Sequence, residues 1–329
     1  MSSKPMKKLN NKMRVVHKRK LAILLATYNG AEFLKEQLDS LFSQQEKEWD
    51  LIISDDCSKD NTPAILREYA ERYPEHVFIL ENEISSGSSK NNFFRLMQKA
   101  DDYDYLMFSD QDDVWKPDKV AHTLQAMKRL ESGERDVPCL VHTDLNVVGA
   151  DLSLLHESFI QSSMLDPSRC DLKQLVIQNI FTGCTMMINA ALREKALLPA
   201  DMDSIRMHDA WCGLWAAAVG RIGFVPEKTI FYRQHGTNVV GAKNVSSLRY
   251  LVGYLRRGRQ NRQALADAER QAGAFLAAAG DALNEEQKQM LYDYSTLRQK
   301  KKIERIRVIA KYGIWKTGWR RCAGEIIQI

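Results

Sequence analysis

The feature that most constrains the fold is a unit of strand, polar loop and helix that occurs four times in succession. The apolar run Leu21–Ala26 is typical of a strand buried on both faces, and residues 34–42 carry an apolar stripe at helical spacing. The same order follows in residues 51–73, 77–99 and 105–127. Such units form parallel sheets with right-handed crossovers. The sequence therefore predicts an α/β fold with a mainly parallel sheet flanked by helices.

The rest of the chain is less regular. Strands are expected at 139–143, 184–188 and 229–233, and a helix is expected at 208–219. Charged, Ala-rich sequence then predicts long helices over 248–279 and 285–311. These changes of character divide the chain into a basic arm, one large domain and a basic helical extension, which we place at residues 1–20, 21–244 and 245–329.

Charge is unevenly distributed along the chain. Residues 1–20 hold eight Lys and Arg and no acid, and residues 245–329 hold seventeen basic and eight acidic residues. Because the whole chain carries only +5, residues 21–244 are acidic. Basic ends are compatible with solvated tails or with attraction to an anionic membrane surface. No nucleic-acid-reading motif is present, and a nucleic-acid partner is not expected.

Cysteine use and hydropathy bear on the compartment. The six cysteines are scattered without a C-x-x-C pair, which favours a reducing cytoplasm over a disulfide framework. No run approaches the roughly 18 apolar residues that a membrane-spanning helix needs. The basic start also lacks the apolar core of a secretion signal. We therefore expect neither a leader nor a transmembrane anchor.

A cluster of acids follows the fourth predicted strand directly. Asp110, Asp112 and Asp113 are three carboxylates within four residues, and they repel one another unless a cation gathers them. Mg²⁺ and Mn²⁺ prefer oxygen ligands, and Mg²⁺ is usually held by carboxylates together with substrate phosphates. Because the carboxyl ends of parallel strands meet at one edge, this loop is a candidate site for a metal and a diphosphate.

Polar residues also end the first two strands. Asp55 and Asp56 follow the second strand, where an Asp can accept hydrogen bonds from a nucleotide or organise its own turn. The first strand ends in Thr27, Tyr28 and Asn29, and the tyrosine is a candidate to stack on a base. Neither G-x-G-x-x-G nor G-x-x-x-x-G-K-[ST] is present, so a glycine-rich helix start is not what holds the phosphates.

Three motifs together resemble family 2 glycosyltransferases: Ala-Thr-Tyr-Asn-Gly at 26–30, Ile-Ser-Asp-Asp-Cys-Ser-Lys-Asp-Asn-Thr at 53–62, and Phe-Ser-Asp-Gln-Asp-Asp-Val-Trp-Lys-Pro-Asp-Lys at 108–119. The third is most similar to bacterial rhamnosyltransferase-like members that build O-antigen or capsule polysaccharides. The resemblance covers about residues 21–241. It implies a GT-A fold, a nucleotide-diphosphate sugar donor of the dTDP or UDP kind, a divalent cofactor (Mg²⁺ or Mn²⁺) and inversion at the anomeric carbon.

The resemblance also assigns roles to residues. Tyr28 and Asp56 match nucleoside-binding positions, and Asp110 and Asp112 match the D-x-D pair that faces metal, diphosphate and ribose. Asp113 is a third candidate metal ligand, and which carboxylate ligates directly stays open. Thr27, Asn29 and Asp55 are expected beside the donor.

The catalytic base is expected at the start of the helix near residue 208. Inversion needs an acid that deprotonates the acceptor hydroxyl, and Asp209 in His208-Asp209-Ala210-Trp211 matches the family's position. Asp is also a good helix cap, which is the competing interpretation. Gly183 is a candidate for the floor beneath donor or acceptor, while Arg233 and His235 are candidates to contact phosphate or metal.

The sequence favours an inverting glycosyltransferase of surface-polysaccharide synthesis, acting at the inner face of the cytoplasmic membrane on a saccharide or lipid-linked saccharide acceptor. Two alternatives stay open: a sugar-1-phosphate nucleotidyltransferase, and a non-catalytic nucleotide-sugar-binding scaffold. The first usually carries a glycine- and lysine/arginine-rich loop after strand one, which Ala-Thr-Tyr-Asn-Gly lacks. The second is tested by replacing Asp209 with Asn, which should abolish turnover while leaving donor binding.

Overall fold

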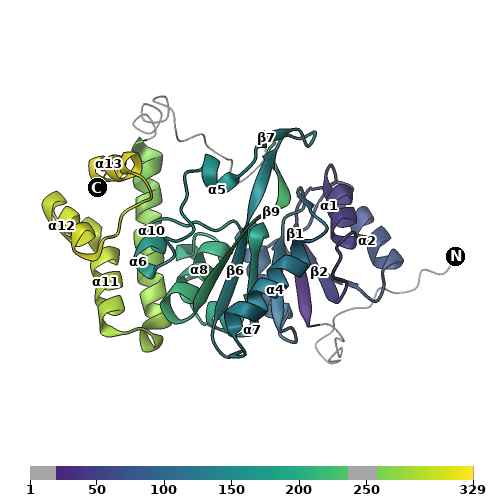
Figure 1. Cartoon of the computed structure of the whole chain (residues 1–329), viewed down its shortest axis with the longest axis horizontal. Helices are drawn as coiled ribbons and strands as arrows, with labels where there is room; N and C mark the ends of the chain where they lie inside the picture. Colours follow the sequence, from purple (N-terminus) through teal and green to yellow (C-terminus); the bar gives the residue numbers. More distant parts are fainter. Residues whose placement is uncertain (1–19, 236–257, 329) are drawn as a thin grey trace.

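The structure of the protein is a computed structural model that describes residues 20–235 and 258–328 (Figure 1). Most of the predicted basic arm, 1–20, and the predicted boundary at 244/245 therefore lie outside the described residues. So does the first part of the helix predicted over 248–279.

Four strands of the parallel half follow the predicted units. They pair in parallel in the order β3-β2-β1-β4. Their bounds are β1 Leu21–Thr27, β2 Trp49–Asp55, β3 Val77–Leu80 and β4 Tyr105–Ser109. The helices that alternate with these strands are α1 Leu34–Phe42, α2 Thr62–Arg72, α3 Ser89–Lys99 and α4 Lys119–Glu131. This confirms the α/β repeat and brings the loops after β1, β2 and β4 to one edge of the sheet.

The other half of the sheet is mixed rather than parallel. Within the described residues the order continues from β4 as β8-β6-β9-β5, with β7 paired to β6. Only β6 and β9 pair in parallel here, and the other pairs are antiparallel. The bounds are β5 Val114–Trp115, β6 Cys139–Val148, β7 Leu154–His156, β8 Met186–Asn189 and β9 Arg221–Arg233. This half therefore departs from the parallel order of the first, because an apolar run does not encode the direction of its strand.

Short helices connect these strands, and one longer helix packs behind them. Their bounds are α5 Phe159–Ser162, α6 Leu172–Leu175, α7 Ala190–Ala196 and α8 His208–Val219, with 3-10 turns η1 Gly183–Thr185 and η2 Met202–Ser204. The described residues of α8 from His208 to Ala216 are all buried. Such a helix is apolar on every side, as expected for an element inside the fold.

Alternation along β1 explains the two-sided core. Leu21, Ile23 and Leu25 pack in one apolar cluster with α1, α2 and α4. Ala22, Leu24 and Ala26 pack in a second cluster with α3, α7 and α8. Successive side chains of a strand point to opposite faces, so a strand without polar positions is covered on both sides. The rigid sheet between these clusters fixes the loops at its carboxyl edge.

The C-terminal helices lie at the opposite end of the molecule from α1 and α2 (Figure 1). Their bounds are α10 Gly258–Ala279, α11 Glu285–Ser295, α12 Lys302–Tyr312 and α13 Trp319–Gln328, with 3-10 turns η3 Gly280–Ala282 and η4 Leu297–Gln299. The helix predicted over 285–311 is thus two helices, broken where Leu297 turns into the core. Phe275 of α10 packs edge-on against Trp211 and Trp215 of α8, with ring centroids 5.4 and 5.1 Å apart. These helices therefore share the core of the α/β unit.

Among residues 20–235 and 258–328, no helix is both long and apolar enough to cross a bilayer.

Candidate active site

The loops after β1 and β2 are tied together by side-chain hydrogen bonds. Thr27 Oγ1 donates to Asp55 Oδ1 over 2.8 Å, and the backbone amide of Asn29 donates to Ser58 Oγ over 2.8 Å. Asp55 also accepts from the amide of Ser58 at 3.0 Å and from its hydroxyl at 2.6 Å. The predicted convergence of these loops is present, and Asp55 organises the turn that it begins.

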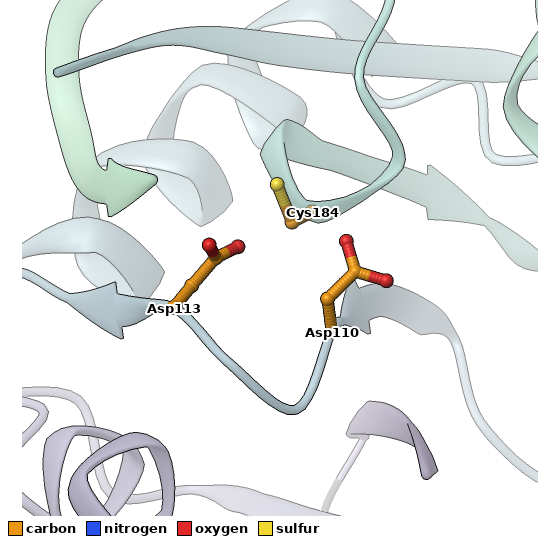
Figure 2. Close-up of side chains that lie close together, drawn as sticks. All are labelled: Asp110, Asp113 and Cys184. Atoms are coloured by element: carbon orange, nitrogen blue, oxygen red, sulfur yellow. The ribbon is translucent and has the colours of Figure 1, made fainter. Parts of the chain in front are cut away.

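Asp110 and Asp113 point from the two ends of the loop after β4 toward Cys184, which lies in η1 (Figure 2). One ligand atom of each of these three residues lies within 4.8 Å of the others. Asp113 is fully buried and accepts from the amide of Arg233 over 3.1 Å. The loop therefore presents two carboxylates to one small space, which is the arrangement that a cation stabilises.

Asp112 takes a different direction from its two neighbours. Its Oδ2 lies 2.7 Å from Nε2 of His235, just beyond the end of β9. The ring centroids of His235 and Phe33 lie 5.0 Å apart. The structure thus brings the predicted residues Asp112 and His235 together, so that a carboxylate and an imidazole share one side of the loop.

Arg233 is held in a way that the sequence did not predict. It is 1% exposed, and its guanidinium donates to the carbonyl of Asp112 over 2.9 Å and to Glu36 over 2.6 Å. It also donates to the carbonyl of Ala150, and its Cζ lies 4.4 Å from the centre of the Phe33 ring. These contacts tie β9 to the acidic loop from behind. The prediction that Arg233 pairs with phosphate does not fit this buried position.

The carboxylates of this loop have raised pKa values. Burial, then the neighbouring charges of Asp112 and Asp209, raise the pKa of Asp110 to about 7. Burial and the charges of Asp112 and Asp110 raise the pKa of Asp113 well above its usual range. Both shifts disfavour the ionised form in the absence of a compensating charge.

A buried lysine and a thiol complete the surroundings of Asp113. Burial lowers the pKa of Lys119 to about 8, and its Nζ lies 4.5 Å from the centre of the Trp115 ring. Burial and Asp113 raise the pKa of Cys184 well above its usual range, so the thiol stays protonated. A protonated thiol is a poor ligand for a hard cation. The donor set here therefore fits Mg²⁺ or Mn²⁺ through its carboxylate oxygens.

Asp209 lies in the first turn of α8 and is 8% exposed. Burial raises its pKa to about 6, and hydrogen bonds from Ala210, Asn179 and Gly183 oppose the rise. Its neighbour His208 packs against Gly183, and Cys184 beside that glycine belongs to the same cluster as Asp110, so Asp209 lies near Asp110. A buried carboxylate whose pKa lies near neutrality is suited to accept a proton.

The neighbouring His208 fills the space beneath Asp209. The centroid of its ring lies 4.1 Å from that of Phe93 and 4.8 Å from that of Phe108. Burial lowers the pKa of His208 to about 3. A Cβ on Gly183 would come within 2.6 Å of His208 Nε2. The imidazole that packs against its backbone explains the glycine at 183, and its place in the floor beneath donor or acceptor stays a prediction.

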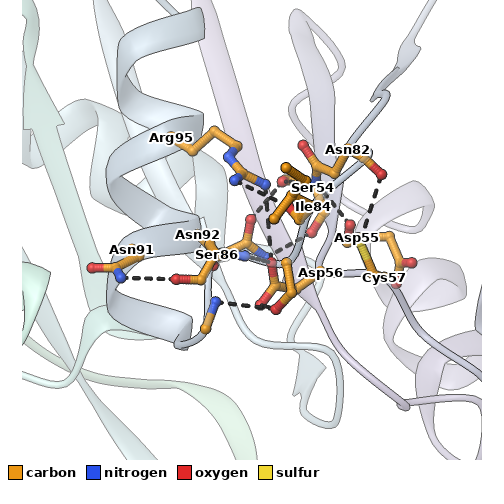
Figure 3. A network of polar contacts seen from close by, with 12 residues as sticks. Ser54, Asp55, Asp56, Cys57, Asn82, Ile84, Ser86, Asn91, Asn92 and Arg95 are labelled. Atoms are coloured by element: carbon orange, nitrogen blue, oxygen red, sulfur yellow. Dashed lines mark hydrogen bonds and ion pairs between the residues drawn. The ribbon is translucent and has the colours of Figure 1, made fainter.

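Asp56 is bound to the loop that follows β3 (Figure 3). It accepts hydrogen bonds from the hydroxyl of Ser85 over 2.9 Å and from the amide of Ser86 over 2.5 Å. Arg95 Nη1 lies 3.9 Å from Asp56 Oδ1. Asn82 donates to the carbonyl of Asp55 over 2.7 Å. The predicted nucleoside-binding position is thus fixed by a serine loop and an arginine.

Tyr28 is 54% exposed, and its backbone is clamped by Gln111. The amide of Tyr28 donates to Gln111 Oε1 over 2.8 Å, and Gln111 Nε2 donates to the carbonyl of Tyr28 over 3.1 Å. A Cβ on Gly30 would lie only 2.2 Å from Gln111 Oε1. This contact could not be predicted from the motif, because Gln111 occupies the variable position of D-x-D. It joins the first predicted loop to the acidic one.

The mixed α/β sheet, with carboxylates at the carboxyl edge of its parallel strands and a buried acid beside them, has the arrangement expected of the GT-A fold. The chain matches the family model Glycosyl transferase family 2 over residues 22–194. It is 30% identical over 231 residues to the dTDP-rhamnosyl transferase RfbG of Shigella flexneri, covering 68% of this chain and 75% of that protein. The chain belongs to glycosyl transferase family 2.

Solved structures agree with this fold. S. aureus TarS 1-349 in complex with UDP-GlcNAc superimposes with a TM-score of 0.54 at 12% identity, covering 94% of this chain and 89% of that one. GalNAc-T7 with UDP, GalNAc and Mn²⁺ superimposes with a TM-score of 0.51 at 14% identity, covering 92% of this chain and 56% of that one. The GT-A fold predicted from the sequence is confirmed.

Proposed function

We propose that this family 2 glycosyltransferase is an inverting, metal-dependent enzyme that transfers a sugar from a nucleotide diphosphate to a saccharide acceptor in surface-polysaccharide synthesis. The observation that carries the proposal is the pairing of two kinds of acid at one edge of the sheet. Asp110 and Asp113 gather around one small space, and the charge of Asp209 acts on Asp110. The first pair fits a cation and the leaving diphosphate, and Asp209 fits the proton acceptor.

Inversion places the acceptor hydroxyl opposite the leaving diphosphate. Asp209 is buried, and the amide of Ala210 donates to its Oδ1 over 2.5 Å, which fixes its orientation. In its ionised form it takes the proton of the acceptor hydroxyl as that oxygen attacks the anomeric carbon. His208, packed against Gly183 and two phenylalanine rings, holds the start of α8 in place beneath it.

The residues that would hold a divalent cation are Asp110 and Asp113, with the pair of Asp112 and His235 beside them. A bound Mg²⁺ or Mn²⁺ would neutralise negative charge on the departing diphosphate. GalNAc-T7, whose structure holds Mn²⁺, supports this assignment. Raised pKa values at Asp110 and Asp113 support it as well, because a cation relieves the burial and repulsion that cause them.

The donor is proposed to lie over the loops after β1 and β2. Tyr28 offers an exposed ring and Asp56 an oriented carboxylate for the base, while Thr27, Asn29 and Asp55 shape the turns between them. A dTDP-sugar, with rhamnose as the sugar, is the first candidate because RfbG is named a dTDP-rhamnosyl transferase. A UDP-sugar is the second candidate, because TarS is known in complex with UDP-GlcNAc.

The acceptor is proposed to be a saccharide or a lipid-linked saccharide, met at the inner face of the cytoplasmic membrane. Seventeen basic residues in 245–329 support attraction to an anionic surface. Deleting this segment would not test the idea, because Phe275 packs against Trp211 and Trp215 in the core. Charge substitutions in the full chain are the appropriate variants.

Calorimetric titration of the full chain tests the proposed donor and metal. We expect one of dTDP-rhamnose, UDP-glucose, UDP-galactose or GDP-mannose to bind with Mn²⁺ and to lose most of its affinity in EDTA. The matched variants are Asp110→Asn, which removes a proposed metal ligand, and Asp118→Asn, which removes a half-exposed acid beyond the loop. Donor binding that is equally tight in EDTA, or equally tight in Asp110→Asn, would contradict the metal assignment.

Transfer itself separates an enzyme from a nucleotide-sugar-binding scaffold. A chain that binds donor and, given a saccharide acceptor, releases nucleoside diphosphate with a glycosylated product is a transferase. Release of pyrophosphate from a nucleoside triphosphate and a sugar 1-phosphate would instead identify a nucleotidyltransferase.

A further inference from the structure

A pocket of about 430 Å³ lies among the C-terminal helices, at the N-terminal end of α10 and beside the segment between α11 and α12. These helices form the green to yellow end of the molecule in Figure 1. The lining is unusually basic, and it comprises Arg259, Arg262, Gln263, Leu265, Glu269, Arg298 and Arg305. We call this the arginine pocket. It belongs to none of the loops that form the active site.

The described lining of the arginine pocket is more basic than acidic. Four of the lining residues are arginines, and Glu269 is the one acid among the lining residues that the structure describes. Glu269 Oε2 lies 3.4 Å from Arg298 Nε, and the charges of Arg298 and Arg305 both oppose the rise in the pKa of Glu269 that burial causes. The lining therefore holds more basic than acidic side chains.

Backbone carbonyls orient two of the guanidinium groups. Arg298 donates to the carbonyl of Arg262 over 2.5 Å, and Arg305 donates to the carbonyls of Lys300 and Arg298 over 2.8 and 3.1 Å. A carbonyl fixes the plane of a guanidinium without cancelling its charge. Gathering like charges costs free energy, and a bound anion relieves that cost, so this arrangement is suited to bind one.

Exposed lysines and an exposed aliphatic side chain lie two to four residues before Arg305 of the pocket. Lys301 precedes α12 and Lys302 begins it, and both are exposed together with Ile303, which is 62% exposed, and Glu304. Basic residues around an exposed aliphatic side chain favour a phospholipid surface, where the charges meet headgroups and the apolar group enters the boundary.

We propose that the arginine pocket binds a phosphate-bearing anion, with a phosphate or diphosphate headgroup as the ligand class. Guanidinium groups bind phosphate oxygens in pairs, and the pocket volume of about 430 Å³ falls within the range of small-ligand sites. The site is separate from the donor site, and the inference does not depend on the transfer reaction. The anion comes either from a lipid headgroup or from a free diphosphate.

Inorganic pyrophosphate in EDTA tests the pocket in solution, because chelation suppresses metal-assisted binding at the active site. We expect measurable binding by calorimetry in the full chain, and a loss of about tenfold in affinity for each of Arg259→Gln and Arg262→Gln. Arg270→Gln is the matched control, because Arg270 lies on the same helix outside the pocket and pairs with Asp267 at 2.7 Å. It should bind pyrophosphate like the unmodified chain.

A second variant acts in the opposite direction and guards against loss through misfolding. Glu269→Gln removes the one acid of the described lining, so pyrophosphate should bind several-fold more tightly. A gain cannot arise from a damaged fold. Absence of both pyrophosphate and vesicle binding in the unmodified chain, or unchanged affinity in all three pocket variants, would overturn the proposal.

Vesicles distinguish the two sources of the anion. The full chain is sedimented with phosphatidylcholine vesicles that contain or lack phosphatidylglycerol, with and without pyrophosphate. A lipid ligand predicts binding only with phosphatidylglycerol, competition by pyrophosphate, and loss in Arg259→Gln/Arg262→Gln but not in Arg270→Gln. A free diphosphate ligand predicts pyrophosphate binding in solution with no retention on either vesicle.

Discussion

Two groups of carboxylates at one edge of the sheet differ in how they are held. In the loops after β1 and β2, which we call the donor loops, Asp55 and Asp56 each accept two or more hydrogen bonds from serine or threonine residues. At the ends of β4 and the start of α8, Asp110, Asp113 and Asp209 are crowded and desolvated, and their pKa values are raised. We call the second group the reaction edge.

The difference separates recognition from chemistry. A carboxylate fixed by several donors keeps one orientation, which suits contact with a base or a ribose. A buried carboxylate near other negative charges readily takes a proton or a cation, which suits a reaction that needs both. Substitutions in the two groups should therefore weaken different steps.

The largest effect is expected for Asp209→Asn at the reaction edge. An amide cannot take the acceptor proton, so we expect kcat to fall by about 10²–10⁴-fold while the donor Kd stays within about twofold. Folding should survive, since Asn is tolerated at a helix start. Asp203→Asn, at an exposed position before α8, is the control and should keep full activity. Equal losses in kcat and in donor affinity would remove the distinction between the two groups.

The pH dependence of the rate follows from the same residue. The raised pKa of Asp209, about 6, means that the side chain is protonated below that pH and ionised above it. Because the ionised form is the base, kcat should rise tenfold per pH unit below about 6 and level off above it. A rate measured under saturating donor and acceptor checks this, and a rate that rises as the pH falls would contradict the assignment.

A smaller effect, confined to donor binding, is expected for Gly30→Ala. The new Cβ would lie 2.2 Å from Gln111 Oε1 and would break the clamp on Tyr28. Losing two hydrogen bonds should weaken donor binding by about tenfold to a hundredfold. In a Gln111→Ala background the same substitution should cost little more, which a double-mutant cycle measures. Additive losses would show that the clamp does not explain the glycine.

Asp56→Asn should weaken the donor about tenfold with little change in kcat. The amide removes the negative charge that strengthens the hydrogen bonds from Ser85 and Ser86 and attracts Arg95, so the serine loop is held less firmly. Donor affinity and kcat are measured beside Asp209→Asn. A fall in kcat with donor affinity intact would place Asp56 with the reaction edge instead.

The last prediction concerns stability, not catalysis or donor binding, and a buried histidine outside both groups. The His142 ring lies between the rings of Phe181 and Phe224, with ring centroids 4.9 Å apart in both pairs. Burial there lowers the pKa of His142 to about 3. The unfolded chain binds a proton near pH 6.5 that the folded chain does not, so this residue lowers the free energy of unfolding by about 1.4 kcal/mol per pH unit from 6.5 down to 3.

His142→Phe removes the pH-dependent contribution of His142 to the free energy of unfolding. We therefore expect the difference in Tm between the variant and the unmodified chain to move in favour of the variant as the pH falls from 7 to 4. His122→Gln, whose side chain is 43% exposed, is the control that removes an imidazole without altering the core. A difference in Tm that stays constant with pH would show that His142 is protonated in the folded chain.

Most of the parallel half could be predicted because its signals are local. An apolar run such as Leu21–Ala26, ended by Thr27 and Tyr28, specifies a buried strand and its turn within a few residues. The antiparallel pairing of β8 with β4, and the break between α11 and α12 at Leu297, could not be predicted in this way. They depend on which distant surface each segment covers, and hydropathy patterns carry no direction.

The candidate site shows the same contrast between local sequence signals and contacts that join distant segments. The amino-acid order alone determined the acids at 55–56 and 110–113 and their meeting at the carboxyl edges of parallel strands, because strand direction and loop position follow from the repeat. Only the tertiary structure decided that Gln111 clamps Tyr28, that Arg233 is buried behind the loop, and that His208 requires Gly183. Those contacts join residues far apart in the chain, and only packing in three dimensions fixes the distances between such residues.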